Sequence, residues 1–265
     1  MEILRKLLCR WLFLSFGLCS LLRGQYWDLD SSYGPVLEDD VAKVRDITAI
    51  PYPGGRLLLG AGSTVINGKI VTLKWVRMGA DSTLDPNFQF SGTTGVLAVY
   101  PDGRILVDER VDNNTSKVRI RRLNADGTAD ASFTESIVDN YSYLKATLLT
   151  DGRILLYGTY ATIDSIGRKG LALLKSDGGL DPSFVSPVTG DNVILNHAVQ
   201  SSDGQKIILA GSNLTRAGAA NNAVAAMSLT GPVDAGFAAA VDFGSGAYKV
   251  YPLSGGAMLV AGGSG

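Results

Sequence analysis

Two short phrases repeat along this chain at one spacing, and that repetition constrains the fold more than any other feature. The first phrase is a turn glycine, usually preceded by Asp, followed by an apolar run. Its copies lie at Gly54–Leu59, Asp102–Val107, Asp151–Leu156, Asp203–Leu209 and Gly255–Val260. Successive turn glycines are 48 to 52 residues apart, and they are Gly55, Gly103, Gly152, Gly204 and Gly256. Such spacing is typical of tandem structural units.

The second phrase places an Asp three residues before an aromatic residue and alternates with the first. Its copies are Asp30 with Tyr33, Asp85 with Phe88, Asp130 with Phe133, Asp181 with Phe184, and Asp234 with Phe237. The aromatic residues are 45 to 55 residues apart. Because two unrelated phrases keep one period, we treat residues 25–265 as one repeat domain.

Each unit contains hairpin signals and no convincing helix. In the third unit, Ala146–Thr150 is a short apolar segment, Asp151-Gly152 is a two-residue turn signal, and Arg153–Tyr157 is an apolar run. Gly170–Lys175 is a further apolar run, and a second turn signal leads into Leu180–Phe184. This pattern predicts three to four antiparallel strands in each unit.

The apolar runs are continuous, as in Ile105–Val107, Ile154–Leu156 and Ile207–Leu209. A sheet with one wet face would alternate polar and apolar residues, so both faces of these strands must be covered. No amphipathic helices are available to cover them, whereas small antiparallel sheets stacked around an axis cover one another. The sequence therefore predicts an all-β fold, a β-propeller of about five repeats of roughly 50 residues. Glycines just past the runs, such as Gly158 and Gly211, suit close backbone approach or a bulge.

Two other architectures fit less well. The repeats of a β-helix are much shorter, and a β-sandwich does not explain a fifty-residue period. The chain opens on the second phrase of one unit and ends just after the apolar run of the fifth. We therefore expect the ring of blades to be incomplete.

The combination of Leu123–Phe133 with Thr150–Leu155 resembles the delta-60 repeat of bacterial β-propellers. The resemblance covers nearly everything after Gly24, and the pattern departs at Gly231–Asp234 and at Leu253–Gly256. It implies a secreted or surface-associated propeller, frequently part of larger envelope proteins. The family carries no established catalytic residues to transfer.

Residues 1–24 lie outside the repeat and have the pattern of a signal peptide. Arg5 and Lys6 form a positive region, and Trp11–Leu22 is apolar but too short to span a bilayer comfortably. We expect cleavage between Gly24 and Gln25, with Ser20 as the alternative cleavage point, and export to the cell envelope or the medium of a bacterium. Both cysteines of the chain lie in this segment, so we expect no disulfide in the mature chain. No apolar run continues after Gly24, so we also expect the mature chain to have no transmembrane segment.

The charge of the chain excludes one class of partner. Without residues 1–24 the chain has 20 Lys and Arg against 24 Asp and Glu, a net charge of about −4. This balance offers no electrostatic attraction for nucleic acid. His197 is the only histidine, and we interpret it as a structural or exposed strand residue because one imidazole cannot form a metal cluster. We expect neither a cofactor nor a catalytic residue that can be named.

The repeated carboxylates and aromatic rings are interpreted as structural. Asn124, Asp126 and Asp130 have the alternate-residue spacing of an oxygen-ligand loop, but the other units lack it, so we expect backbone-bonding turns and no metal. One aromatic residue per unit suits a packing plug between blades. The structural repeat positions are Asp85, Phe88, Asp102, Gly103, Asp130, Phe133, Asp151, Gly152, Asp181, Phe184, Asp203, Gly204, Asp234 and Phe237.

Exposed aromatic residues that could stack on a sugar are better sought outside the repeated positions. The candidates are Trp27, Trp75, Tyr141, Tyr143 and Tyr160. Acidic clusters such as Glu38–Asp40 and Asp108-Glu109 are expected to be solvated loops.

Two hypotheses of function follow. The first is a non-catalytic surface module that binds a glycan, a peptide or a partner domain through loops at one end of the propeller. The second is a glycan-active hydrolase or lyase with carboxylates around the central channel. Propellers host both, and the absence of an unrepeated carboxylate pair favours the binding module.

Overall fold

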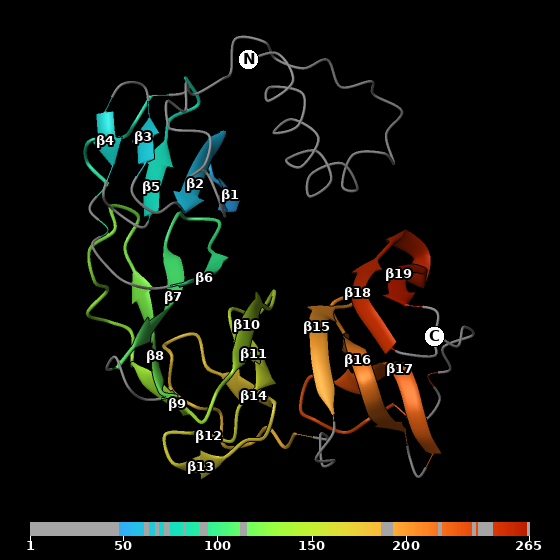
Figure 1. Ribbon diagram of the computed structural model, residues 1–265. Coiled ribbons are helices and arrows are strands. Elements are labelled where there is room, and N and C mark those ends of the chain that lie inside the picture. The colour runs from blue at the N-terminus through green and yellow to red at the C-terminus, as the bar shows by residue number, and fades with distance from the viewer. Residues whose placement is uncertain are drawn as a thin grey trace. The chain divides into compact units, whose positions relative to one another are not determined.

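The computed structural model describes residues 48–60, 64–66, 69–71, 75–81, 83–88, 90, 95–111, 116–186, 193–216, 219–234, 237 and 246–263. The expected signal peptide, Asp30, Tyr33, Trp27 and Glu38–Asp40 lie outside these residues. The chain divides into two compact units, residues 1–91 and 92–265, and each is described by itself. In both units the described residues form antiparallel sheets and no α-helix (Figure 1). None of the described residues forms a helix that is long and apolar enough to span a membrane.

The first unit contains one three-stranded sheet and a small hairpin. The sheet has the order β1-β2-β5, and its strands are β1 (Thr48–Tyr52), β2 (Arg56–Gly60) and β5 (Trp75–Met78). The hairpin consists of β3 (Thr64–Ile66) and β4 (Lys69–Val71). Leu58 and Met78 are fully buried in the sheet. We call this sheet blade 1.

The second unit begins with the largest sheet, blade 2. Its own strands are β6 (Gly95–Val99), β7 (Ile105–Arg110), β8 (Val118–Leu123) and β9 (Ser136–Asp139). The hairpin β12 (Thr162–Ile163) and β13 (Ile166–Gly167) extends the sheet beyond β9, although it belongs to the next repeat in the sequence. Ile163 pairs with Val138 across this junction, and both are fully buried. The third repeat therefore covers the edge strand of the second, an edge that would otherwise be open to unwanted pairing.

Three further sheets follow in the second unit. Blade 3 consists of β10 (Tyr143–Leu148), β11 (Ile154–Thr159) and β14 (Leu171–Leu174). Blade 4 consists of β15 (Ile194–Gln200), β16 (Lys206–Arg216) and β17 (Ala219–Ser228). Blade 5 consists of β18 (Gly246–Pro252) and β19 (Met258–Gly263), joined through the 3-10 turn η2 (Ser254–Gly256).

The Asp-Gly signals of blades 2 and 3 form hairpin loops of one kind. In blade 3 the amide of Gly152 donates to the carbonyl of Leu149, and the amide of Leu149 donates to the carbonyl of Arg153. Gly152 has φ +87°, a left-handed conformation that glycine adopts without steric cost. The connection is therefore a turn followed by a left-handed glycine, one residue longer than the two-residue turn that the sequence suggested.

The apolar runs are buried on both faces, as their continuity predicted. In β11, Leu155 belongs to a cluster with residues of blade 4, whereas Ile154 and Leu156 belong to a cluster with residues of blade 2. In β16, Ile207 packs toward blade 3 and Ile208 packs toward blade 5. Neighbouring residues of one strand thus enter different interfaces, because side chains alternate across a strand. The prediction of blades that cover one another is confirmed within this unit.

The first strands of the four sheets of this unit, β6, β10, β15 and β18, lie side by side in succession. We call them the inner strands. Side chains connect them to neighbouring backbones: Thr147 Oγ1 donates to the carbonyl of Ala198 over 2.6 Å, and Asn196 Nδ2 donates to the carbonyl of Ala247 over 2.9 Å. Gly158 and Gly211 lie just past the runs, and a Cβ at either would overlap the backbone of an inner strand, as the sequence predicted.

Several sequence predictions about exposure were wrong. Asp108 and Glu109 are not in a solvated loop, because β7 continues through them to Arg110. Trp75 and Tyr160 were proposed as exposed aromatics, but both are buried. Tyr160 also donates its hydroxyl hydrogen to the carbonyl of Leu156, which gives it a structural role. Tyr141 and Tyr143 are half-buried.

Candidate functional site

The repeated Asp of the second phrase forms the same local bond in three blades. Its carboxylate accepts the backbone N–H two residues later over 2.9 Å. The donor and acceptor residues are Asn87 with Asp85, Ser132 with Asp130, and Ser183 with Asp181. A carboxylate that bonds its own backbone in this way fixes a turn.

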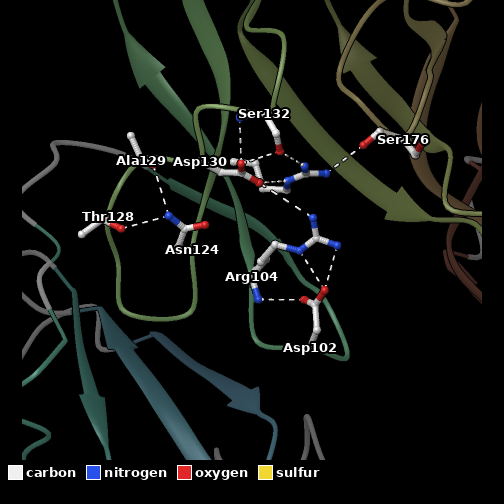
Figure 2. Close-up of polar contacts among 9 residues, drawn as sticks. Asp102, Arg104, Asn124, Thr128, Ala129, Asp130, Ser132 and Ser176 are labelled. Carbon is white, nitrogen blue, oxygen red and sulfur yellow. Dashed lines mark hydrogen bonds and ion pairs between the residues drawn. The ribbon is translucent and has the colours of Figure 1, made fainter.

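Asp130 is also held by cations (Figure 2). Arg122 Nε donates to Asp130 Oδ2 over 2.7 Å, and Arg104 Nη1 lies 3.8 Å from the same oxygen. Ser132 Oγ donates to Asp130 Oδ1 over 2.6 Å. The Ser132 hydroxyl bond and the Arg122 contact lower the pKa of Asp130 to about 2. This carboxyl is therefore ionised at neutral pH and cannot donate a proton.

Arg122 joins two blades while it holds Asp130. Its guanidinium is buried over the rings of Tyr100 and Phe133, at 5.7 and 4.8 Å from their centroids. Arg122 Nη1 donates to the carbonyl of Ser176, in the turn of blade 3, over 2.8 Å. In blade 1, Arg77 occupies the corresponding position, donates to Asp85 through Nε and Nη2, and also lies between aromatic rings.

The spacing that resembled an oxygen-ligand loop does not bring three ligands together. Asn124 Nδ2 donates to Thr128 Oγ1, and Asp126 Oδ1 accepts the amide and hydroxyl of Thr128, whereas Asp130 binds Arg122. Figure 2 shows Asn124 and Asp130 directed to different partners. In the part of the chain that the structure describes, no group of three His, Cys, Asp or Glu side chains could hold a metal ion.

Three of the repeated aromatic residues lie in the interfaces between blades. Phe133 belongs to the cluster shared by blades 2 and 3, and Phe184 belongs to the cluster shared by blades 3 and 4. Phe237 packs against the cluster of blades 4 and 5, and Phe88 is buried in the first unit. These rings fill space between sheets and are not a surface ladder for sugars.

A different set of polar side chains lies along the inner strands. Lys145 of β10, His197 of β15 and Lys249 of β18 each lie seven residues before a turn glycine. They also share a register, because they pair with Tyr157, Ala210 and Ala261 on the second strands of their sheets. We call Lys145, His197 and Lys249 the inner-strand cluster.

His197 is the centre of the inner-strand cluster. Its ring lies 6.3 Å from the ring of Tyr157, in a T-shaped contact, and 6.1 Å from that of Tyr251. Its Nδ1 accepts the backbone N–H of Val250 over 3.4 Å, so Nε2 carries the hydrogen of the neutral ring. Burial lowers the pKa of His197, and the positive charges of Lys145 and Lys249 lower it further. The ring is therefore a neutral hydrogen-bond donor at neutral pH.

Bulges shape the strands at this level. The register of β15 shifts between Leu195 and His197, and that of β18 shifts between Ala247 and Lys249. The bulge of β18 leaves Tyr248 unpaired, and this side chain is 55% exposed. Bulges re-aim side chains and are frequent beside functional sites.

Sequence reasoning considered His197 alone and missed Lys145, Lys249 and Tyr248. A signal was present, since the position seven residues before the turn glycine is basic in three successive repeats. The corresponding residue of blade 2 is Val96, so the feature does not extend through the second unit.

Comparison with known proteins supports the class of the fold. A family model described as "Domain of unknown function (DUF5122) beta-propeller" matches residues 101–133 and 149–184. The matched segments contain β7, β8, β11 and β14 together with both repeated phrases. No curated protein and no solved structure gave a match. The antiparallel, mutually covered sheets and this family match define a β-propeller.

Proposed function

We propose that this chain is a non-catalytic β-propeller binding module and that its ligand contacts the inner-strand cluster. The observation that carries the proposal is a difference in exposure. The faces of the blades are apolar and buried, whereas the inner-strand cluster places charged side chains in solvent. Lys145 and Lys249 are exposed there, and among the described residues neither forms a salt bridge. Polar groups that converge beside aromatic rings are the usual lining of a binding site.

The repeated carboxylates support binding over hydrolysis. A glycosidase needs one carboxylic acid with a raised pKa and a second carboxylate beside it. Asp85, Asp130 and Asp181 instead have lowered pKa values, because each carboxylate is hydrogen-bonded in a turn or to arginine. Each of these residues is therefore engaged in holding the fold.

One observation favours the alternative, a glycan-active hydrolase or lyase. Burial raises the pKa of Asp108, which lies against the backbone of Gly95 at the start of an inner strand. An acid of this kind could donate a proton. A turnover assay on the glycans that bind, with Asp108→Asn as the variant, decides this alternative: activity abolished by the substitution would replace the binding module with an enzyme.

The proposal also includes a place in the cell and a repeat family. We infer a delta-60 type of repeat and export through residues 1–24, to the cell envelope or the medium. The positive and apolar regions before Gln25 support export. Mass measurement of the exported protein tests it, and a product that retains Met1 would contradict it.

Binding is tested with the full chain against arrays of neutral glycans, acidic glycans and peptides. We expect at least one class to bind, and we expect the Lys145→Ala/Lys249→Ala double variant to lose that binding. Lys175→Ala is the matched control, because Lys175 is exposed in a turn of blade 3, at the other end of the hairpin. Binding that survives the double variant would show that the ligand contacts another surface.

A further inference from the structure

We propose that the inner-strand cluster recognises the carboxylate of an acidic sugar unit. This inference rests on the proposed binding function and specifies the chemistry of its ligand. Three basic residues from three consecutive blades meet at one level of the inner strands. A neighbouring aromatic side chain is open to solvent.

The charges at this level are of one sign. Lys145 and Lys249 lie on the two strands next to β15, and each acts on His197, since both positive charges lower its pKa. The other titratable groups against the His197 ring are Tyr157 of β11 and Tyr251 of β18, and neither side chain can carry a positive charge. No carboxylate of the described residues forms an ion pair with either lysine. An anion is the group that would relieve this repulsion.

The lysines stay exposed although the chain as a whole is acidic. Many other cations of the second unit are neutralised by a carboxylate, as Arg122 is by Asp130 and Lys206 is by Asp234 at 2.6 Å. A local positive site on a negative protein attracts a small anionic group without attracting a long polyanion such as nucleic acid.

Aromatic rings beside the charges favour a sugar over an inorganic anion. The Lys145 ammonium lies 5.2 Å from the centroid of the Tyr143 ring, and Tyr143 Oη donates to the carbonyl of Asn196 over 3.3 Å. Both residues are on β10, and the hydroxyl bond connects the Tyr143 ring to the adjacent inner strand β15. Tyr248, next to Lys249, presents an exposed ring at the bulge. A ring supplies a flat apolar surface for the C–H face of a pyranose, while the cations pair with its carboxylate.

His197 adds a donor that does not depend on charge. Because Nδ1 is occupied by the Val250 N–H, Nε2–H is the hydrogen that a ligand oxygen can accept. The site therefore combines two ammonium groups, one neutral N–H donor and flanking rings. A carboxylated monosaccharide unit matches this combination.

The test is calorimetric titration of the full chain with a short oligogalacturonate and with its methyl ester, which has the same sugar skeleton without the charge. We expect the oligogalacturonate to bind at least about tenfold more tightly than the ester, because charge-assisted bonds are roughly twice as strong as neutral ones. Lys145→Ala and Lys249→Ala should each weaken binding about fivefold or more, whereas Lys175→Ala should leave it unchanged. Both lysines are exposed, so all three variants are expected to melt like the parent chain.

The outcomes separate this inference from the proposed function. Equal binding of the acid and the ester, lost in both lysine variants, would overturn the carboxylate inference and leave the binding module intact. Equal binding of a polyglutamate peptide and the oligogalacturonate would overturn the preference for a sugar. Absence of binding to all three probes overturns the inference, and the array separately decides whether the chain binds any ligand.

Discussion

Blades 2 and 3 are each connected to the next blade by an arginine, but the arginine comes from a different position of the repeat. Both blades have the repeated Asp at the start of the second phrase, and in both a cation beside this Asp donates to a backbone carbonyl in the turn of the next blade. In blade 2, Arg122 holds Asp130 and donates to the carbonyl of Ser176. The backbone N–H of Asp130 donates to the carbonyl of Arg122, and that of Asp181 donates to the carbonyl of Leu173. Leu173 is therefore the residue of blade 3 that corresponds to Arg122.

The cation of blade 3 comes from the hairpin loop. Arg153 Nη1 lies 3.8 Å from Asp181 Oδ2 and donates to the carbonyl of Leu229, in the turn of blade 4, over 3.3 Å. Leu173 is fully buried in the cluster that contains Phe184. Both blades therefore have the repeated Asp and a bonded carbonyl in the next blade. The arginine that contacts both is in strand β8 in blade 2 and in the hairpin loop in blade 3.

The largest expected effect comes from removing the buried cation. Arg122→Ala should lower the free energy of unfolding by about 3 kcal/mol, because it leaves the largely buried Asp130 carboxylate without its close cation and removes the Arg122 bond to the Ser176 carbonyl. Arg153→Ala should cost about 0.5–1 kcal/mol, since Arg153 is more exposed and its contacts to Asp181 and to the Leu229 carbonyl are longer. Denaturant unfolding of both variants measures the difference. Equal losses would mean that the two blades depend on their cations to the same degree.

A smaller effect is expected from the repeated carboxylates themselves. Asp130→Ala should cost about 2 kcal/mol and Asp181→Ala about 1 kcal/mol, since both lose a turn bond but only Asp130 also loses a close arginine. The same unfolding assay with added calcium serves as a control, and calcium should barely change the melting temperature of the parent chain. A large shift that a chelator reverses would instead indicate a metal at these residues.

The smallest expected effect is a dependence of the free energy of unfolding on pH in the acid range. The pKa of Asp130 is about 2, below its ordinary value of 3.8, so its ionised form stabilises the folded state. This contribution is complete above the ordinary value and is lost as the pH falls toward about 2. Asp130→Asn keeps an acceptor for Ser132 and removes the charge. The difference in unfolding free energy between the parent and this variant should shrink over that range, and a constant difference would contradict the assignment.

Much of the fold was predictable from local chemistry. Continuous apolar runs such as Ile154–Leu156 indicate two covered faces, and an Asp-Gly pair between such runs indicates a hairpin. The length of a strand was less visible. Asp108 and Glu109 are polar and follow an apolar run, so they suggested a loop, but the ladder between β7 and β8 continues through them. Pairing with a neighbour decided their structure, against their polarity.

The candidate site was harder to predict because it depends on register between repeats. Lys145, His197 and Lys249 are separated by about fifty residues, and each alone has the pattern of a solvated strand residue. They become neighbours only when the inner strands are placed side by side. The burial of Arg122 was equally difficult to predict, because an arginine in a strand is usually expected at the surface. Its burial depends on the Phe133 ring and the Asp130 carboxylate, which the structure places against it.

The most direct test uses the one histidine of the chain as a probe of its own site. In the free full chain, an NMR titration of the His197 ring should give a pKa below the ordinary value of 6.5, because burial and the two lysines disfavour its charged form. With saturating oligogalacturonate the carboxylate should oppose the lysines, and the pKa of His197 should rise. An unchanged pKa in the presence of bound oligogalacturonate would show that no carboxylate enters the inner-strand cluster.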